Sequence, residues 1–346
     1  MRQLAAQDKF SGTVLLVHAG RPVLARSYGM ADKQRSVRNG PDTIYALASV
    51  TKMFTAVAIA QLLQQGRLAL GEKLDTYLDG FPAEVANAVT IHQLLTHTSG
   101  MGDYAQSPGY FDEAFTWTTA EQVFDRTLGY VRQAPLAFIP GSAFLYSNSG
   151  YHTLGAIVAK VSGQDYYSYV REHVFARAGM TSSDFYTKPQ WSTGVRFARP
   201  YATQPSGERA DASDLEPYIG WPAGNSFATA PDLVRFAQAL RGDELLEPAF
   251  TELVLGPKVP MPPLPPKPGV TPPIGFQAYV PGAKLVNHQW AVGHNGAAPG
   301  ISTNLEWFPA SGWVVVKLSN YDVPTTAAID EMARTLITQH YRGQST

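Results

Sequence analysis

The β-strand pattern of this 346-residue chain is confined to its two ends, and a long helical stretch separates them. Near the N-terminus, two apolar runs flank a short turn, which predicts a hairpin of Ser11–His18 with Pro22–Tyr28. Near the C-terminus, three further strands are predicted over Trp290–His294, Ile301–Phe308 and Trp313–Ser319. We therefore expect an α/β (α+β) fold, with one antiparallel sheet of about five strands built from both termini and flanked by helices.

The chain between these strands carries helical signals. Ser49–Gln65 is rich in alanine, leucine, isoleucine and methionine, and Gly66 follows it, which is typical of a helix with a glycine stop. Its apolar positions fall on one side, so we expect this helix to be buried in the middle of the protein. Other predicted helices cover Tyr151–Ser162, Ala230–Arg241 and Thr325 to about Tyr341.

These signals predict two lobes. Residues 1–75 and 275–346 would form a sheet-plus-helix lobe, and residues 76–274 a mainly helical lobe inserted into it. Within the second lobe, the stretch 257–273 is dominated by proline, which excludes a helix or a central strand and predicts an extended, stiff loop. Two interpretations remain open for it, a plain surface loop and a lip over the active site.

Composition excludes several classes of partner and chemistry. Apolar residues make up 45% of the chain and charged residues 16%, which indicates a folded globule. A net charge of -1 gives no field for binding nucleic acid or an anionic membrane, and no apolar run reaches the roughly 18 residues of a membrane span. The chain has no cysteine, so disulfides, thiolate catalysis and cysteine metal ligands are excluded.

The N-terminal sequence does not indicate a cellular compartment. Met1–Phe10 lacks the charged-then-apolar layout of a secretory signal. A cytoplasmic chain and a chain whose signal was removed both fit this start, and in the second case the absence of cysteine favours the periplasm or the exterior. No oligomeric state is predicted.

The segment Ser49-Val50-Thr51-Lys52 is the first candidate for catalysis. A hydroxyl and an amine three residues apart at the start of a helix lie on the same face and can form a hydrogen bond. A serine hydroxyl needs a base to become a nucleophile, and a desolvated lysine with a lowered pKa can be that base. A capping serine beside a solvated lysine is the alternative, because the pair alone is a short and common motif.

Two further motifs lie in loops or at a strand end. Tyr146-Ser147-Asn148 precedes a predicted helix and offers a phenol and an amide, the latter suited to hold a substrate carbonyl or amide. His294-Asn295-Gly296 ends a predicted strand, where the imidazole would face a cleft and the glycine would let a substrate approach the backbone. A packed tyrosine and a strand-ending histidine are the structural alternatives.

In their order and approximate spacing, these three motifs resemble the serine β-lactamase and penicillin-binding protein superfamily. The similar branch includes class C β-lactamases, D-alanyl-D-alanine carboxypeptidases, D-aminopeptidases and family VIII esterases. Leu94–Gly100 (LLTHTSG) and Val314–Asn320 (VVVKLSN) also resemble segments of that branch, so the similarity extends from about residue 10 to 341. It implies a β-lactamase/transpeptidase-like fold and a serine hydrolase that needs no cofactor and no metal.

The resemblance also implies roles for individual residues. Ser49 would attack a carbonyl, and Lys52 would accept its proton or lower the pKa of Tyr146. Tyr146 would pass the proton to the leaving group and later activate water. The oxyanion would lie between the backbone N–H groups of Ser49 and Ala297. His294 would form the facing wall, and Asn148, Asn295, Gly296 and Ala297 would bind the substrate.

One departure from the family affects substrate choice. Many β-lactamases have Lys-Thr-Gly where this chain has His294-Asn295-Gly296, so a fixed cation is replaced by an imidazole that is largely neutral at pH 7. Recognition of a substrate carboxylate is weakened, which favours an ester, an amide or a small peptide as substrate. An acyltransferase, a D-Ala-D-Ala carboxypeptidase or a β-lactamase on the same fold stays open.

Other classes of protein fit less well or stay as alternatives. A Gly-x-Ser-x-Gly elbow, the mark of α/β-hydrolases, is absent from the sequence. His92 and His97 are five residues apart without a neighbouring glutamate, unlike a zinc hydrolase motif, and we expect His97 to be a structural hydrogen-bonding residue of its loop. A ligand-binding or sensor protein that keeps the fold without turnover is the alternative from another class.

Overall fold

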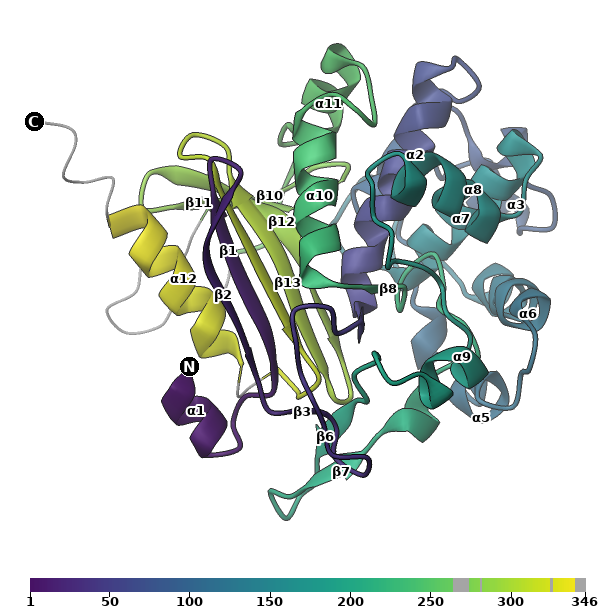
Figure 1. Cartoon of the computed structure of the whole chain (residues 1–346). Helices are drawn as coiled ribbons and strands as arrows, with labels where there is room; N and C mark the ends of the chain where they lie inside the picture. The colour runs from purple at the N-terminus through teal and green to yellow at the C-terminus, as the bar shows by residue number, and fades with distance from the viewer. Residues whose placement is uncertain (264–273, 281, 324–325, 340–346) are drawn as a thin grey trace, which may run out of the picture.

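A large β-sheet lies between two helices on one face and a body of helices on the other (Figure 1). The computed structural model describes the chain apart from residues 264–273, 281, 324–325 and 340–346. The sheet has eight strands in the order β2-β1-β14-β13-β12-β11-β10-β9, and each neighbouring pair is antiparallel. Its strands are β1 (Gly12–His18), β2 (Arg21–Tyr28), β9 (Val259–Pro260), β10 (Ile274–Gln277), β11 (Gly282–Val286), β12 (Gln289–Ala298), β13 (Ile301–Phe308) and β14 (Trp313–Ser319).

The predicted fold class is confirmed, because strands from both termini meet in one antiparallel sheet. β1 pairs with β2 on one side and with β14 on the other, which joins the two ends of the chain. β12 is longer than predicted and runs to Ala298. Three short strands, β9 to β11, extend the sheet beyond β12. β9 lies within the proline-rich stretch, whose residues 264–273 are outside the described part of the chain, and with them most of the predicted loop or lip.

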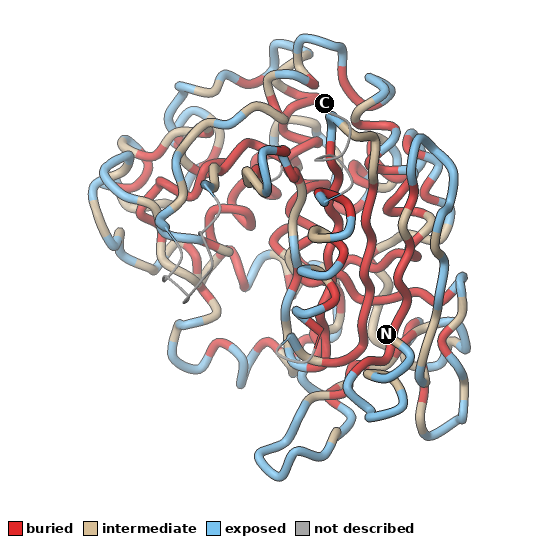
Figure 2. The backbone as a smooth tube through the Cα atoms, turned by 90° about the vertical axis from the view of Figure 1, so that its left-hand side faces the viewer, coloured by how far each residue is buried: buried red, intermediate tan, exposed pale blue. Residues whose placement is uncertain are grey.

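Side chains of β1 alternate between two apolar layers, which explains its continuous apolar sequence. Leu15 and Val17 face the main core, which lies under the helical body. Val14 and Leu16 face the other side, which α1 (Arg2–Ala6) and α12 (Ala327–Gln339) cover. A strand that is buried on both faces shows no polar alternation. Figure 2 shows the buried stretches in the interior and the exposed ones in the outer loops.

The remaining helices form the body on the opposite face. Those with the longest runs are α2 (Lys52–Gln64), α6 (Ala120–Gln133), α7 (Asn148–Ser162), α10 (Ala230–Arg241) and α11 (Pro248–Leu255). The shorter ones are α3 (Ala83–Ala86), α4 (Ile91–Leu95), α5 (Tyr110–Ala114), α8 (Tyr166–Val170) and α9 (Lys188–Thr193). None of the described helices has both the length and the apolar content that crossing a lipid bilayer requires. α10 packs on β1 and β14. The division of the chain into two lobes stays a prediction.

The central helix α2 is buried on all sides rather than on one. It begins at Lys52, after the 3-10 turn η1 (Ala48–Thr51), and every residue from Lys52 to Leu62 is buried. The helices α7, α8 and α11 contact it, which accounts for the complete burial. The charged residue at its first position is therefore carried into the interior of the protein.

Gly296 allows β12 to approach η1 closely. A Cβ atom at this position would lie 2.1 Å from the carbonyl oxygen of Leu47 and 2.4 Å from Oγ1 of Thr303. The Thr303 hydroxyl donates a hydrogen bond of 2.7 Å to the same Leu47 carbonyl, so β13 is fastened to the segment before η1. Only a residue without a side chain fits between them. The sheet is thereby brought against the turn that carries Ser49.

We expect Gly296→Ala to destabilise the protein by about 2 kcal/mol, because the added methyl group meets backbone that cannot move aside freely. Thermal or urea unfolding measures the change. Gly129→Ala is the matched control, since nothing lies within 4 Å of the added Cβ in helix α6 and alanine is the better helix former. Equal stability of Gly296→Ala and the wild type would contradict the close contact of β12 with η1.

Candidate active site

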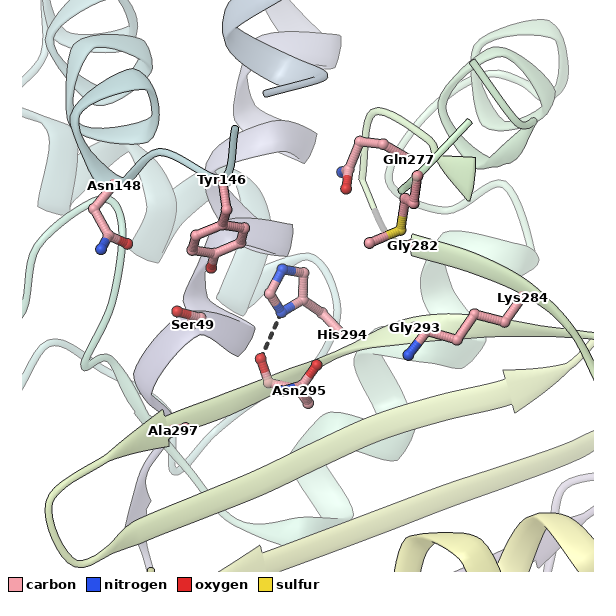
Figure 3. Close-up of a pocket in the computed structure, with 11 residues that line it drawn as sticks. Ser49, Tyr146, Asn148, Gln277, Gly282, Lys284, Gly293, His294, Asn295 and Ala297 are labelled. Atoms are coloured by element: carbon pink, nitrogen blue, oxygen red, sulfur yellow. Dashed lines mark hydrogen bonds between the residues drawn. The ribbon is translucent and has the colours of Figure 1, made fainter. Parts of the chain in front are cut away.

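A cleft of about 400 Å³ opens between the helical body and the sheet (Figure 3). Six of the eight residues singled out from the sequence line it, namely Ser49, Tyr146, Asn148, His294, Asn295 and Ala297. The other two are buried behind this lining, Lys52 in contact with Ser49 and Gly296 between two lining residues of β12. The structure therefore brings all eight together, while their roles stay predictions.

A strained turn presents Ser49 to the cleft. The preceding residue, Ala48, has a φ of 46°, a left-handed conformation that costs a non-glycine residue roughly 1–3 kcal/mol. The Thr51 hydroxyl holds the turn, with distances of 2.8 Å to the Ala48 carbonyl oxygen and to the Ser226 hydroxyl. The short strands β5 (Tyr45–Ala46) and β8 (Phe227–Ala228) pair beside it. Contacts from one distant segment, residues 226–228, thus keep the turn in place.

Lys52 contacts three oxygen atoms. Its Nζ lies 3.0 Å from Ser49 Oγ, 2.7 Å from Asn148 Oδ1 and 2.5 Å from the carbonyl oxygen of Ala223. Burial lowers the pKa of Lys52 to about 7, because the ammonium form loses its hydration, and the Asp103 carboxylate acts in the opposite direction. Charged and neutral lysine are therefore both populated near neutral pH.

Tyr146 covers Lys52 from the helical side. The Lys52 Nζ lies 4.8 Å from the centre of its ring. Burial raises the pKa of the Tyr146 phenol, a hydrogen bond with Ser49 opposes this, and the Asp103 carboxylate adds to the increase. The phenol is therefore protonated at neutral pH and able to donate a proton or a hydrogen bond.

His97 supports Tyr146 from behind. Its ring is buried and lies 4.4 Å from the Tyr146 ring and 5.1 Å from the Tyr151 ring, measured between ring centres. Its Nδ1 accepts a hydrogen bond of 3.1 Å from the backbone N–H of Ser147. His97 thus acts structurally, as expected from the sequence, and its hydrogen bond joins its own loop to the Tyr146-Ser147-Asn148 motif.

Asp103 is a site residue that the sequence did not indicate. Its Oδ2 accepts a hydrogen bond of 2.7 Å from Asn148 Nδ2, and Asn148 in turn accepts from Lys52. Asn148, expected to hold the substrate, is thus engaged by two protein groups. The only signal for Asp103 is an acidic residue shortly after the Leu94–Gly100 segment, and sequence spacing does not show which side chain it meets.

His294 forms the opposite wall from β12. Its Nδ1 is 2.6 Å from the carbonyl oxygen of Asn295, and because a carbonyl only accepts, this nitrogen carries the proton in the neutral ring. Burial lowers the pKa of His294 to about 4, and the nearby Lys52 amine contributes. The imidazole is therefore neutral at pH 7, and its Nε2 is left as an acceptor.

Five more lining residues come from outside the motifs, namely Met261, Gln277, Gly282, Lys284 and Gly293. Gln277 is the last residue of β10, and Lys284 lies in the middle of β11. Both strands were absent from the predicted sheet, so the pattern of the sequence could not place these side chains at the cleft. Lys284 brings a cation to a wall that otherwise carries a neutral imidazole.

A family model described as Beta-lactamase matches residues 1–339. A penicillin-binding protein from Bacillus halodurans superposes with a TM-score of 0.81 at 29% identity, over 96% of this chain and 98% of that chain. D-amino acid amidase from Ochrobactrum anthropi SV3 gives a TM-score of 0.78 at 21% identity, over 98% and 96%, a likeness of fold alone. Esterase EstB from Burkholderia gladioli is 32% identical over 210 residues, which span 58% of this chain and 52% of the esterase.

We expect Asp103→Asn to lower the pKa of Lys52 below about 7. The carboxylate favours the ammonium form of Lys52, so its removal favours the neutral amine, while asparagine can still accept the hydrogen bond from Asn148. NMR titration of isotopically labelled lysine side chains measures the shift. Asp112→Asn, on the exposed surface of α5, should leave the pKa of Lys52 as it is. An unchanged pKa in Asp103→Asn would show that Asp103 does not act on Lys52.

Proposed function

This chain belongs to the Beta-lactamase family and is a serine hydrolase of that fold, and we propose that it cleaves an ester or amide bond through a covalent acyl intermediate on Ser49. The observation that supports this most strongly is the set of three oxygen atoms around Lys52 Nζ. It gives the neutral amine one orientation, in which its lone pair points at the Ser49 hydroxyl.

The orientation follows from which groups can donate. The Ala223 carbonyl can only accept, so it takes one N–H of Lys52. Asn148 donates its amide to the Asp103 carboxylate, which fixes its oxygen toward Lys52 to take the second N–H. A neutral amine has two N–H groups and one lone pair, and the hydroxyl of Ser49 is the remaining partner. When Lys52 is neutral, Ser49 would therefore donate to it, which is the arrangement of a nucleophile with its base.

The proposed reaction then runs in two halves. Ser49 Oγ attacks the carbonyl carbon as its proton passes to Lys52, and the backbone N–H groups of Ser49 and Ala297 would stabilise the oxyanion. Tyr146, whose phenol is protonated at neutral pH, would relay a proton to the leaving group as the bond to it breaks. Water, activated through the same groups, would then release the acid and restore Ser49.

We propose that the substrate is an ester, an amide or a small peptide that carries little or no charge next to the scissile bond. The neutral state of His294 at pH 7 supports this choice, because no cation stands at the position where many β-lactamases carry lysine. Two similar proteins are an esterase and a D-amino acid amidase, which supports the proposal of ester and amide chemistry on this fold.

Ser49→Ala should lower kcat on a p-nitrophenyl ester by several orders of magnitude, because the acyl intermediate has no atom on which to form. The same variant should gain no mass on incubation with a fluorophosphonate, whereas the wild type gains one adduct. Ser168→Ala, on the exposed surface of α8, is the control and should react like the wild type. Ester turnover that survives in Ser49→Ala, or a wild type that stays unlabelled and inactive on esters and amides, would contradict the proposal.

The dependence of kcat/KM on pH should follow the protonation of Lys52. Only the neutral amine can take the serine proton, so kcat/KM should be low below pH 7 and rise to a plateau above the Lys52 pKa of about 7.

Lys52→Ala and Tyr146→Phe should each reduce kcat/KM by orders of magnitude. The double variant should lose less than the two single effects combined, because both substitutions break the same proton path. Additive losses would indicate two independent functions.

A further inference from the structure

Part of β12 has an open edge inside the cleft. β11 pairs with β12 only from Gln289 to Gly293, while β13 follows the other side of β12 to Ala298. Among the described strands, none pairs with His294–Ala298 on the β11 side. The backbone groups along such an edge can hydrogen-bond to an extended substrate. A bound substrate can therefore run along β12 up to the point where β11 begins to pair with it.

Lys284 stands where this open edge begins. It lines the cleft from β11, and Figure 3 shows its ammonium group directed along β12 toward the side where Asn295 lies. Of the described residues that line the cleft, Lys284 is the only lysine or arginine, and no acidic residue is among them. An anion in this part of the cleft would thus meet a positive charge without a competing carboxylate in the lining.

The two carboxylates that act electrostatically on Lys284, Glu306 and Asp330, already have other partners. Glu306 accepts two hydrogen bonds from Arg334, at 2.8 Å and 3.0 Å. Asp330 accepts one of 2.7 Å from Lys317. Burial and the Arg334 guanidinium lower the pKa of Lys284, and the Glu306 and Asp330 carboxylates oppose this. Both carboxylates that act on Lys284 therefore have another cation as their hydrogen-bonding partner.

The direction of the cleft indicates which part of a substrate reaches Lys284. Ala297 and Ser49 lie at one end, and the rings of Tyr146 and His294, 6.2 Å apart, come next (Figure 3). Lys284 lies beyond His294. Tyr146 is the proposed proton donor to the leaving group, so the leaving group extends from Ser49 past His294 toward Lys284.

We propose that Lys284 recognises a carboxylate at the far end of an extended leaving group. Asn295 and Gly293 are two and four residues from Ala297, which at about 3.3 Å per residue places the anion roughly 7–13 Å from the scissile carbonyl. A carboxylate on a leaving group of one residue lies only about 4 Å away and does not reach Lys284. The substrate class is therefore an ester or amide whose leaving group has the length of two or three residues and ends in a carboxylate. This inference rests on the proposed acylation of Ser49, which fixes where the scissile carbonyl lies.

Matched esters test the inference. One acyl group is esterified with hydroxyacetic acid, which gives a short leaving group, or with ω-hydroxyhexanoic acid, which gives a long one. Each ester is compared with the same ester in which an uncharged carboxamide replaces the terminal carboxylate. The ratio of kcat/KM for acid over carboxamide should exceed one for the long pair and stay near one for the short pair. In Lys284→Gln the ratio for the long pair should fall about tenfold or more, the size expected for one hydrogen bond to a charged group. Lys160→Gln, an exposed lysine in the last turn of α7, should keep the wild-type ratio.

A binding measurement separates this inference from the proposed reaction. Calorimetry on Ser49→Ala and on Ser49→Ala/Lys284→Gln gives the Kd of the long acid and its carboxamide without turnover. Tighter binding of the acid that depends on Lys284 supports the inference, even where the wild type hydrolyses neither ester and the acyl mechanism fails. If Lys284 only balances charge beneath the sheet, Lys284→Gln changes the melting temperature and shifts the Kd of the acid and of the carboxamide by the same factor. An equal ratio of the two Kd values in Ser49→Ala and Ser49→Ala/Lys284→Gln would overturn the inference.

Discussion

The burial of the Lys52 amine at the first turn of the central helix is the constraint on which the site depends. An ammonium group in the interior loses its hydration, so it either finds acceptors or gives up its proton. Here it does both in part, since three oxygen atoms surround it and its pKa falls to about 7. A residue at a helix terminus in solvent would have neither property. The proton affinity proposed for catalysis is therefore a consequence of packing around α2.

The cleft is a junction between elements that are far apart along the chain. η1 carries the serine, the start of α7 carries the tyrosine motif, and β12 supplies the facing wall. Two features determine how η1 meets β12: a left-handed Ala48 before the serine and a glycine in β12 where the strand contacts the segment around η1. Both features place strain or close contact beside the reacting groups, where rigid positioning has the largest effect on the proposed chemistry.

The charges of the cleft are distributed differently from what the motifs alone suggest. The imidazole of the third motif is neutral at pH 7, because burial and the neighbouring Lys52 disfavour its protonation. A positive charge lies further along β12, on Lys284 of the neighbouring strand. A substrate therefore meets an uncharged wall at the scissile bond and a cation at a distance, so the length of the leaving group becomes part of the recognition.

The sequence by itself determined the fold class, the strands at both ends and the eight residues that gather at the cleft, because strand periodicity and short motifs are local properties. Tertiary structure alone decided what those residues contact. The partners of Lys52 and Asn148 lie 96, 171 and 45 residues away along the chain, so no spacing rule reveals Ala223 or Asp103. The cation on β11 is equally hidden, because its strand is short and only its register against β12 brings it to the cleft. Contacts between distant segments, and the pKa shifts that burial causes, exist only once the chain has folded.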